Sequence, residues 1–206
     1  MNFLKQFFFY LGKLWTFAYI PSVCQAMEST LAYIYTGVHA RRFKVFGNGS
    51  CMAWGCTFRN PQYITIGCNN IFLRNTAISV TPTTDFQSPH INIGNHCHFG
   101  IRNHITCINN ITIGDNLLTG GYVLISDNAH GTVDKNMLNI PPFDRPLVSK
   151  GGVTIGNNVW IGDKVSILAG VHIGDNAIIG ANSVVTKDIP ANSVAVGIPA
   201  RIIKQF

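Results

Sequence analysis

Histidine is the side chain best suited to proton transfer near neutral pH, and one of the seven histidines in this chain stands apart. His130 lies in the stretch Asp-Asn-Ala-His-Gly at residues 127–131, directly after the apolar residues 123–125. An imidazole in such a loop can take a proton from a weakly acidic hydroxyl and return it to a leaving group. A lone loop histidine is more often an ordinary surface residue, so the surrounding fold has to decide between the two interpretations.

A strict six-residue repeat organises the chain after this loop. One apolar position recurs at Ile155, Ile161, Ile167, Ile173, Ile179 and Val185. A second position, two residues earlier, recurs at Val153, Val159, Val165, Val171, Ala177 and Ser183. A period of six fits neither an α-helix nor one long strand, whose side-chain periods are about 3.6 and 2.0. Short strands separated by Gly-Asn or Gly-Asp turns fit it, and three such units form one 18-residue coil of a parallel β-helix.

Longer spacings upstream predict insertions in this β-helix. The repeat restarts after 27, 20 and 42 residues, counted between Ile64, Ile91, Ile111 and Val153. Subtracting one 18-residue coil leaves 9, 2 and 24 residues, which predicts a loop at 81–89, a small bulge, and a long loop inserted at about 126–152. Long loops on a regular scaffold commonly carry function, so the loop that holds His130 is a candidate functional site.

The first part of the chain has a helical pattern instead. We therefore divide the chain into an N-terminal helical segment, residues 1–40, and a β-helix domain, residues 41–206. Within residues 2–20, Lys5 and Lys13 share one helix face with polar neighbours, while the other face is mainly aromatic and aliphatic. The charges and the short length argue against a secretory signal and a membrane span. Two interpretations remain: a helix in the membrane interface, or one packed on the prism or a neighbouring subunit.

The ends of these two segments are also predicted. Pro21 is expected to close the first helix, and residues 22–40 to form a second, weaker helical or irregular stretch. Residues 192–199 are expected to turn the chain off the prism. Residues 201–204 then form a basic end, either a final strand or a short capping helix.

Composition narrows the classes of partner. Charged residues make up 12% of the chain, about half the usual share, which suits flat faces covered by other subunits. The net charge is +6, with Glu28 as the single glutamate, and this favours a phosphate-rich cofactor or an acidic membrane surface. No basic run alternates with aromatics, which argues against nucleic acid. The six cysteines have no CxxC pair, and we expect a reducing, cytoplasmic location.

Four further histidines, His90, His96, His98 and His104, fall within fifteen residues and raise the question of a metal site. In an 18-residue coil, residues six or eight apart lie on different faces, so these side chains do not converge on one ion. We therefore expect no metal.

The stretches IGNNVWIG, IGDNAIIGANSVVTKDIP and GIPARII resemble the hexapeptide-repeat acyltransferases, above all the galactoside, maltose and cell-surface-polysaccharide O-acetyltransferases. The resemblance implies an all-β fold, a left-handed parallel β-helix in the form of a triangular prism, assembled as a homotrimer with sites between neighbouring prisms. It also implies transfer of an acetyl group from acetyl-CoA to a hydroxyl. In this family a histidine on or beside the extended loop is the catalytic base, and His130 matches that place.

The same resemblance suggests binding residues. Candidates for the saccharide acceptor are Asn103, His104, Asp127 and Asn128. Candidates for acetyl-CoA are Trp160, Asp163, Ala181, Thr186, Lys187, Arg201 and Lys204. The three basic residues among them, Lys187, Arg201 and Lys204, are expected to face its phosphates. The family often has a small hydroxyl residue where this chain has Asp163.

The identity of the acceptor stays open. The SDNAHG loop and the aromatic N-terminus resemble members that modify polysaccharides, so a cell-surface saccharide or its lipid-linked precursor is the main expectation. Acetylation of a small free acceptor, such as a galactoside, serine or an antibiotic, is the second. A non-catalytic β-helix scaffold is the third, and it would leave the long insertion without a purpose.

Overall fold

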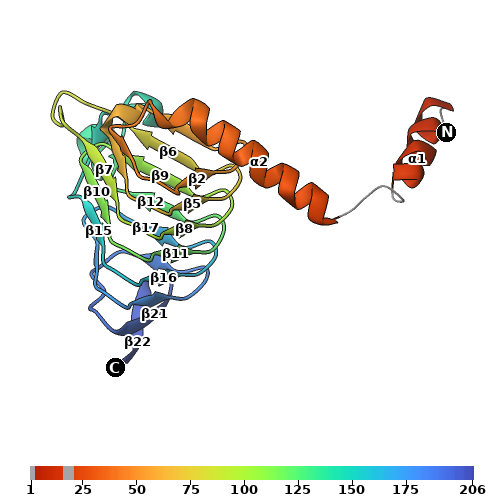
Figure 1. Ribbon diagram of the computed structural model, residues 1–206. Coiled ribbons are helices and arrows are strands. Elements are labelled where there is room, and N and C mark those ends of the chain that lie inside the picture. The colour runs from red at the N-terminus through yellow and green to blue at the C-terminus, as the bar shows by residue number, and fades with distance from the viewer. Residues whose placement is uncertain (1–2, 16–20) are drawn as a thin grey trace.

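The repeat forms a three-sided prism of stacked coils (Figure 1). The computed structural model describes residues 3–15 and 21–206. Within that part of the chain, each coil contributes one short strand to each of three sheets, and neighbouring coils pair in parallel. A hairpin formed by β21 (Ser193–Gly197) and β22 (Ala200–Gln205) closes the C-terminal end.

The strands group by side of the prism. The first sheet contains β1 Val45–Phe46, β4 Ile64–Ile66, β7 His90–Ile93, β10 Asn110–Ile113, β15 Val153–Ile155 and β18 His172–Ile173. The second sheet contains β2 Cys51–Met52, β5 Ile71–Phe72, β8 His98–Phe99, β11 Leu118–Thr119, β16 Trp160–Ile161, β19 Ile178–Ile179, β21 Ser193–Gly197 and β22 Ala200–Gln205. The third sheet contains β3 Thr57–Arg59, β6 Ala77–Val80, β9 His104–Cys107, β12 Leu124–Ser126, β17 Ser166–Ile167 and β20 Val184–Val185.

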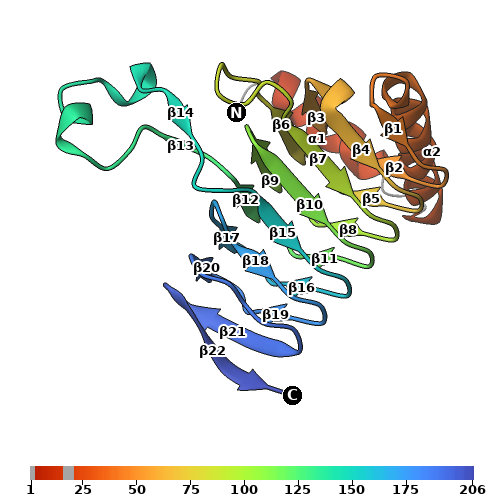
Figure 2. The same cartoon turned by 90° about the vertical axis from the view of Figure 1, so that its left-hand side faces the viewer.

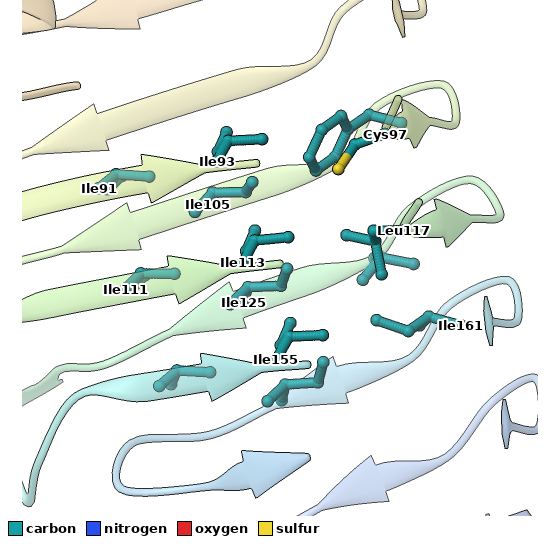
Figure 3. Close-up of a cluster of buried hydrophobic side chains, with 14 of the residues drawn as sticks. Ile91, Ile93, Cys97, Ile105, Ile111, Ile113, Leu117, Ile125, Ile155 and Ile161 are labelled. Carbon is teal, nitrogen blue, oxygen red and sulfur yellow. The ribbon is translucent and has the colours of Figure 1, made fainter. Parts of the chain in front are cut away.

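Aliphatic side chains of successive coils stack inside the prism (Figure 3). Ile155 of β15 is in register with Ile113 of the preceding coil and Ile173 of the following coil, and all three are buried. Each such isoleucine contributes about 1.5–3 kcal/mol by leaving water. The six-residue period therefore exists because every coil must place an apolar side chain over the equivalent one in the next coil.

The corners between the sheets use two kinds of left-handed turn. Between the first and second sheets, asparagines adopt positive φ, and their amides form a ladder from Asn116 to Asn158 (2.9 Å), Asn176 (3.2 Å) and Asn192 (2.9 Å). Asparagine tolerates this conformation at little cost. Between the second and third sheets, the corresponding positions include Arg102, Tyr122 and Lys164, with φ of 55°, 60° and 57°. Larger residues rarely adopt such angles.

Two helices precede the prism, and their boundary corrects one prediction. Helix α1 covers Phe3–Trp15 and α2 covers Pro21–Ala40, so Pro21 begins the second helix and does not close the first. Proline suits the first helical position because the N–H it lacks would be unpaired there. The predictions for residues 2 and 16–20 lie outside the described residues. Among the described helices, none has the length and apolarity needed to cross a membrane.

Helix α2 is fastened to the first coil by its C-terminal half. The Thr36 hydroxyl accepts a hydrogen bond from the Met52 N–H at 2.8 Å, and the Tyr35 hydroxyl donates to the Cys56 carbonyl. The N-terminal half of α2 projects beyond the prism, toward α1 (Figure 1). Many large side chains of α1 and α2 are exposed, including Phe3, Leu14 and Met27.

The two predicted insertions are present. Residues 81–89 form a loop between β6 and β7, and residues 127–152 leave the prism between β12 and β15. The second insertion contains a small hairpin, made of β13 (Ala129–His130) and β14 (Leu147–Val148), and the 3-10 turns η2 (Lys135–Met137) and η3 (Pro142–Asp144). The remaining 3-10 turn that the structure describes, η1, covers Pro61–Tyr63.

The C-terminal end differs from one expectation. Residues 193–197 form β21 and continue the second sheet, whereas the sequence predicted that residues 192–199 leave the prism. Ser193 and Ala195 are fully buried, so the inward alternation continues although a serine replaces an aliphatic residue. The chain then turns at residues 198–199, and β22 pairs antiparallel with β21, which selects the final strand over the capping helix.

Candidate functional site

His130 lies on an arm that projects from the prism. The arm comprises residues 127–152, and Figure 2 shows its hairpin standing away from the three sheets. His130 pairs with Leu147 across the hairpin, and its side chain is exposed. Gly131 follows with a φ of 76°, and a Cβ there would lie 2.9 Å from the side chain of Arg145. The backbone turn after the histidine therefore requires glycine.

Asp127 secures the base of this arm. Its side chain is fully buried, and its carboxylate accepts hydrogen bonds from the N–H groups of Ile108 and Asn109, both at 2.9 Å. The Cys107 thiol also contacts it, at 3.2 Å. Ile108 and Asn109 lie between β9 and β10, at the third-to-first corner, within the stretch where the spacing predicted a small bulge. Burial, reinforced by the Asp127 carboxylate, raises the pKa of the Cys107 thiol well above its usual range.

The four acceptor candidates divide into buried and exposed residues. Asn103 is 2% exposed. Its side-chain NH₂ group donates to the Thr119 hydroxyl, and its side-chain oxygen accepts from the Val123 N–H at 2.9 Å. Asn103 and Asp127 therefore direct their polar atoms into the prism. Asn128 is half-buried and donates to the Thr106 carbonyl at 3.2 Å. His104 points outward from the third sheet and is exposed.

Several acetyl-CoA candidates lie on the second sheet and its corner with the third. Trp160 stands on the outer face of β16, between Leu118 and Ile178, with 52% of its surface exposed. Asp163 is in the corner turn after it, and its carboxylate accepts the Gly121 N–H at 2.6 Å. Ala181 occupies the equivalent turn one coil later and is exposed.

The remaining candidates lie at the third-to-first corner and on the last strand of the second sheet. Thr186 and Lys187 follow β20 at the third-to-first corner, the same corner from which the arm with His130 departs. Arg201 and Lys204 are exposed on β22, and Lys204 packs over the Phe206 ring with its Nζ 4.2 Å from the ring centre. One chain thus places the histidine and Lys187 along one edge of the prism and Trp160 near another.

Two residues near these candidates had not been singled out from the sequence. Arg102 and Tyr122 occupy successive turns of the second-to-third corner, and a guanidinium nitrogen of Arg102 donates to the Tyr122 hydroxyl at 3.2 Å. The guanidinium carbon lies 5.6 Å from the ring centre. The available signal was an arginine and a tyrosine at repeat positions where glycine or asparagine is conformationally favoured.

The clustered histidines do not converge. His90 lies on the first sheet, His96 in a corner turn, His98 on the second sheet and His104 on the third. Among the described residues, no three His, Cys, Asp or Glu side chains are arranged to hold a metal ion.

The fold and the arm define a class: a parallel β-helix of hexapeptide repeats with a histidine-bearing insertion. Residues 152–187 match the model of the bacterial transferase hexapeptide (six repeats) family. A solved maltose O-acetyltransferase from Clostridium difficile 630 is 30% identical, with a TM-score of 0.55, and the match covers 82% of this chain and 73% of that one. The chain belongs to the hexapeptide-repeat transferase family, and its prism is the left-handed parallel β-helix predicted from the sequence.

Two curated relatives match a shorter region. The putative lipopolysaccharide biosynthesis O-acetyl transferase WbbJ of Escherichia coli K12 is 43% identical over 107 residues, 50% of this chain and 54% of that protein. The galactoside O-acetyltransferase of the same organism is 47% identical over 96 residues, 47% of this chain and 44% of that protein. The chain therefore spans about half the length of these relatives. The N-acyltransferase AntD of Bacillus cereus, solved with dTDP and coenzyme A, shares the fold at a TM-score of 0.67 and 20% identity.

Replacing Asp127 by Asn should lower the free energy of unfolding by about 1–3 kcal/mol, because one amide N–H of the bulge would lose its acceptor and face an NH₂ group. Asp144→Asn is the matched control, since Asp144 lies exposed on the arm, and it should change stability by less than about 0.5 kcal/mol. Urea unfolding of both variants measures the difference. Equal midpoints would show that the Asp127 carboxylate does not hold the arm.

Proposed function

We propose that the protein is an O-acetyltransferase that moves an acetyl group from acetyl-CoA to a sugar hydroxyl, with His130 as the general base. One observation carries the proposal: a small hairpin, with Gly131 directly after its first strand, holds His130 outside a hexapeptide-repeat prism. The names of the relatives support the acetyl group and the hydroxyl acceptor. The coenzyme A bound in AntD supports the type of donor.

The reaction needs one proton acceptor that can later act as a donor. The sugar hydroxyl oxygen attacks the thioester carbonyl carbon while His130 takes its proton. When the carbon–sulfur bond breaks, the proton passes to the departing thiolate, leaving an acetyl ester and free coenzyme A. Backbone N–H groups facing the carbonyl oxygen would stabilise its negative charge.

Three buried cysteines are poorly suited to forming an acyl-enzyme, which favours this direct transfer. Only a thiolate is an effective sulfur nucleophile. Burial raises the pKa of the Cys56 and Cys97 thiols to about 11, and the pKa of the Cys107 thiol is raised further. These thiols therefore stay protonated near neutral pH. Unpaired cysteines and an acetyl-CoA donor also suit the cytoplasm, which we propose as the location.

We further propose that the complete site forms between two prisms of a homotrimer. His130 projects away from its own coils, while Trp160 and Asp163 lie near a different edge. The arm of one subunit would bring His130 to acetyl-CoA lying along the second-to-third corner of its neighbour. Asn103 and Asp127 would then position the backbone, and His104 and Asn128 are the remaining acceptor contacts.

The acceptor is proposed to be a cell-surface saccharide or its precursor, which agrees with the name of WbbJ. The galactoside O-acetyltransferase relative favours a small free acceptor as the second candidate. Rates of acetyl transfer to lipopolysaccharide saccharides and to simple galactosides, measured side by side, would distinguish the two.

Replacing His130 by Ala should reduce kcat about 10²–10⁴-fold, because the attacking hydroxyl loses its base. Binding of acetyl-CoA and thermal stability should be retained, since the side chain is exposed on the arm. His172→Ala is the control, because His172 is an exposed histidine on the first sheet. Initial rates with acetyl-CoA and the better acceptor measure the effect. Turnover above half of the unmodified rate would refute the assignment of His130.

A substitution at Lys187 tests whether this residue contacts a phosphate of acetyl-CoA. Lys187→Gln should weaken acetyl-CoA binding about tenfold at low salt, because a charge-assisted hydrogen bond to a phosphate is lost. Lys150→Gln removes an equivalent exposed charge from the end of the arm and should leave the Kd unchanged. Isothermal titration at two salt concentrations provides the measurement. A Lys187→Gln variant that binds as tightly as the control would remove Lys187 from the site.

We also propose peripheral membrane contact through residues 2–20, supported by the exposed apolar side chains of α1 and its lysines. Leu11→Glu should abolish binding to phosphatidylglycerol vesicles, because it puts a carboxylate on the apolar face. Gln6→Glu adds the same charge to the polar face and should reduce binding less. Vesicle co-sedimentation compares them. If neither variant alters the bound fraction, α1 does not contact the membrane.

A further inference from the structure

A groove of about 610 Å³ lies between α2 and the first coils of the second sheet. Its walls are mainly apolar and come from both sides: Leu31 and Ala32 of α2, Ile71 of β5, and Trp54, Leu73 and Ile101 of the corner turns. The volume falls within the range of about 300–1,000 Å³ that is typical of small-molecule sites. Such a groove suits a hydrocarbon chain.

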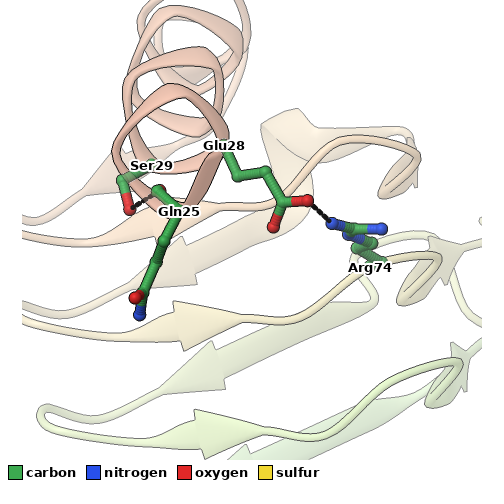
Figure 4. A network of polar contacts seen from close by, with 4 residues as sticks. All are labelled: Gln25, Glu28, Ser29 and Arg74. Carbon is green, nitrogen blue, oxygen red and sulfur yellow. Dashed lines mark hydrogen bonds and ion pairs between the residues drawn. The ribbon is translucent and has the colours of Figure 1, made fainter. Parts of the chain in front are cut away.

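One ion pair lies at the wall of this groove. Arg74, in a corner turn of the second coil, contacts Glu28 of α2 at 2.5 Å (Figure 4), and both residues line the groove. Their side chains are 59% and 63% exposed. Exposed ion pairs contribute little to stability, so an anionic group could replace Glu28 as the partner of Arg74 at little cost. The Arg102 N–H donates to the Arg74 carbonyl at 2.9 Å, which places a second arginine in the next turn of the same corner.

The corner turns that border the groove continue as a stack toward the donor candidates along one edge of the prism. The Tyr122 N–H donates to Ile101 at 2.8 Å, and the Lys164 N–H donates to Gly121 at 2.9 Å, so each turn stacks on the one before it. Arg74 and Asp163 are three coils apart along this edge, about 14 Å at the usual strand spacing. The apolar groove, the two arginines, Tyr122 and the proposed acetyl-CoA residues therefore follow one another in that order.

We propose that this edge binds a lipid-linked saccharide: its hydrocarbon chain occupies the groove beneath α2, its phosphate contacts Arg74 and Arg102, and its sugar extends past Tyr122 toward the acetyl group. The inference rests on the proposed acetyl transfer and specifies the acceptor. Tyr122 offers a flat face for a sugar ring, and its orientation is fixed by Arg102.

The basic charge of the N-terminal segment and the way α2 is held to the prism favour this ligand over a second copy of the chain. Residues 1–44 contain five basic residues, Lys5, Lys13, Arg41, Arg42 and Lys44, against the single Glu28, which suits an anionic amphiphile. The hydrogen bonds of Tyr35 and Thr36 hold the C-terminal end of α2, whereas the middle of the helix, which lines the groove, contacts the prism through the exposed ion pair of Glu28 with Arg74. The wall formed by α2 can therefore adjust to a chain.

The test uses geranyl phosphate, geraniol and inorganic phosphate as probes, each titrated into the chain of residues 1–206. Geranyl phosphate should bind saturably and at least about tenfold more tightly than geraniol or phosphate alone, because it uses both the groove and the arginines. Leu31→Glu, which puts a carboxylate into the apolar wall, should weaken geranyl phosphate about tenfold or more. Val38→Glu adds the same charge on an exposed position of α2 that does not line the groove, and it should leave binding unchanged.

The head-group contact has its own pair of variants. Arg74→Gln should weaken geranyl phosphate and leave geraniol unaffected, whereas Arg59→Gln, an exposed arginine on β3, should change neither. No saturable binding, or equal binding by Leu31→Glu and Val38→Glu, would overturn the proposal. So would a fall in oligomer mass on sedimentation of Leu31→Glu, because the groove would then be a contact between copies. If geranyl phosphate binds as expected but acetyl-CoA does not, the proposed transferase activity fails and the lipid site stands.

Discussion

The structure depends on the vertical stacking of equivalent side chains in successive coils. Ile113, Ile155 and Ile173 lie over one another in paired strands, and the same register is repeated on the other two sheets. Backbone hydrogen bonds and apolar packing therefore impose one spacing on every coil. Extra residues cannot be accommodated within a strand, so insertions leave the prism at its corners. This is why the arm that carries His130 begins directly after β12 and returns directly before β15.

The same constraint makes the corners the places where the sequence is free to vary. At the first-to-second corner, the asparagine ladder satisfies both the left-handed backbone and the side-chain amides. At the second-to-third corner, Arg102, Tyr122 and Lys164 adopt that backbone conformation without such a ladder. Residues held in unfavourable backbone regions are concentrated at functional sites in proteins. Asn75 and Asn182 adopt the same conformation at this corner, so the three larger side chains, and not the backbone alone, distinguish the edge that we propose to bind ligands.

The sequence predicted what depends on spacing. The prism, the loop at 81–89 and the arm followed from counting residues between apolar positions, because the stacking constraint acts directly on that count. It did not predict that Asp127 and Asn103 are buried, since their partners lie about one coil away and reach them through corner backbone. The start of α2 at Pro21 was not predicted either. The extension of the prism by β21 was also missed, because serine and alanine replace the aliphatic residues at its inward positions.

A prism built in this way has flat sides and no deep central cavity, because stacked aliphatic side chains fill its interior. Binding sites must therefore lie outside, where a second element covers an edge or a face. Helix α2 does this over the first coils and creates the groove beside Arg74, and the arm is the other projecting element, at a different corner. His130 and Trp160 lie at different corners of one chain, so under the proposed function a neighbouring prism would bring them together. In that proposal, assembly and catalysis would be one geometric requirement.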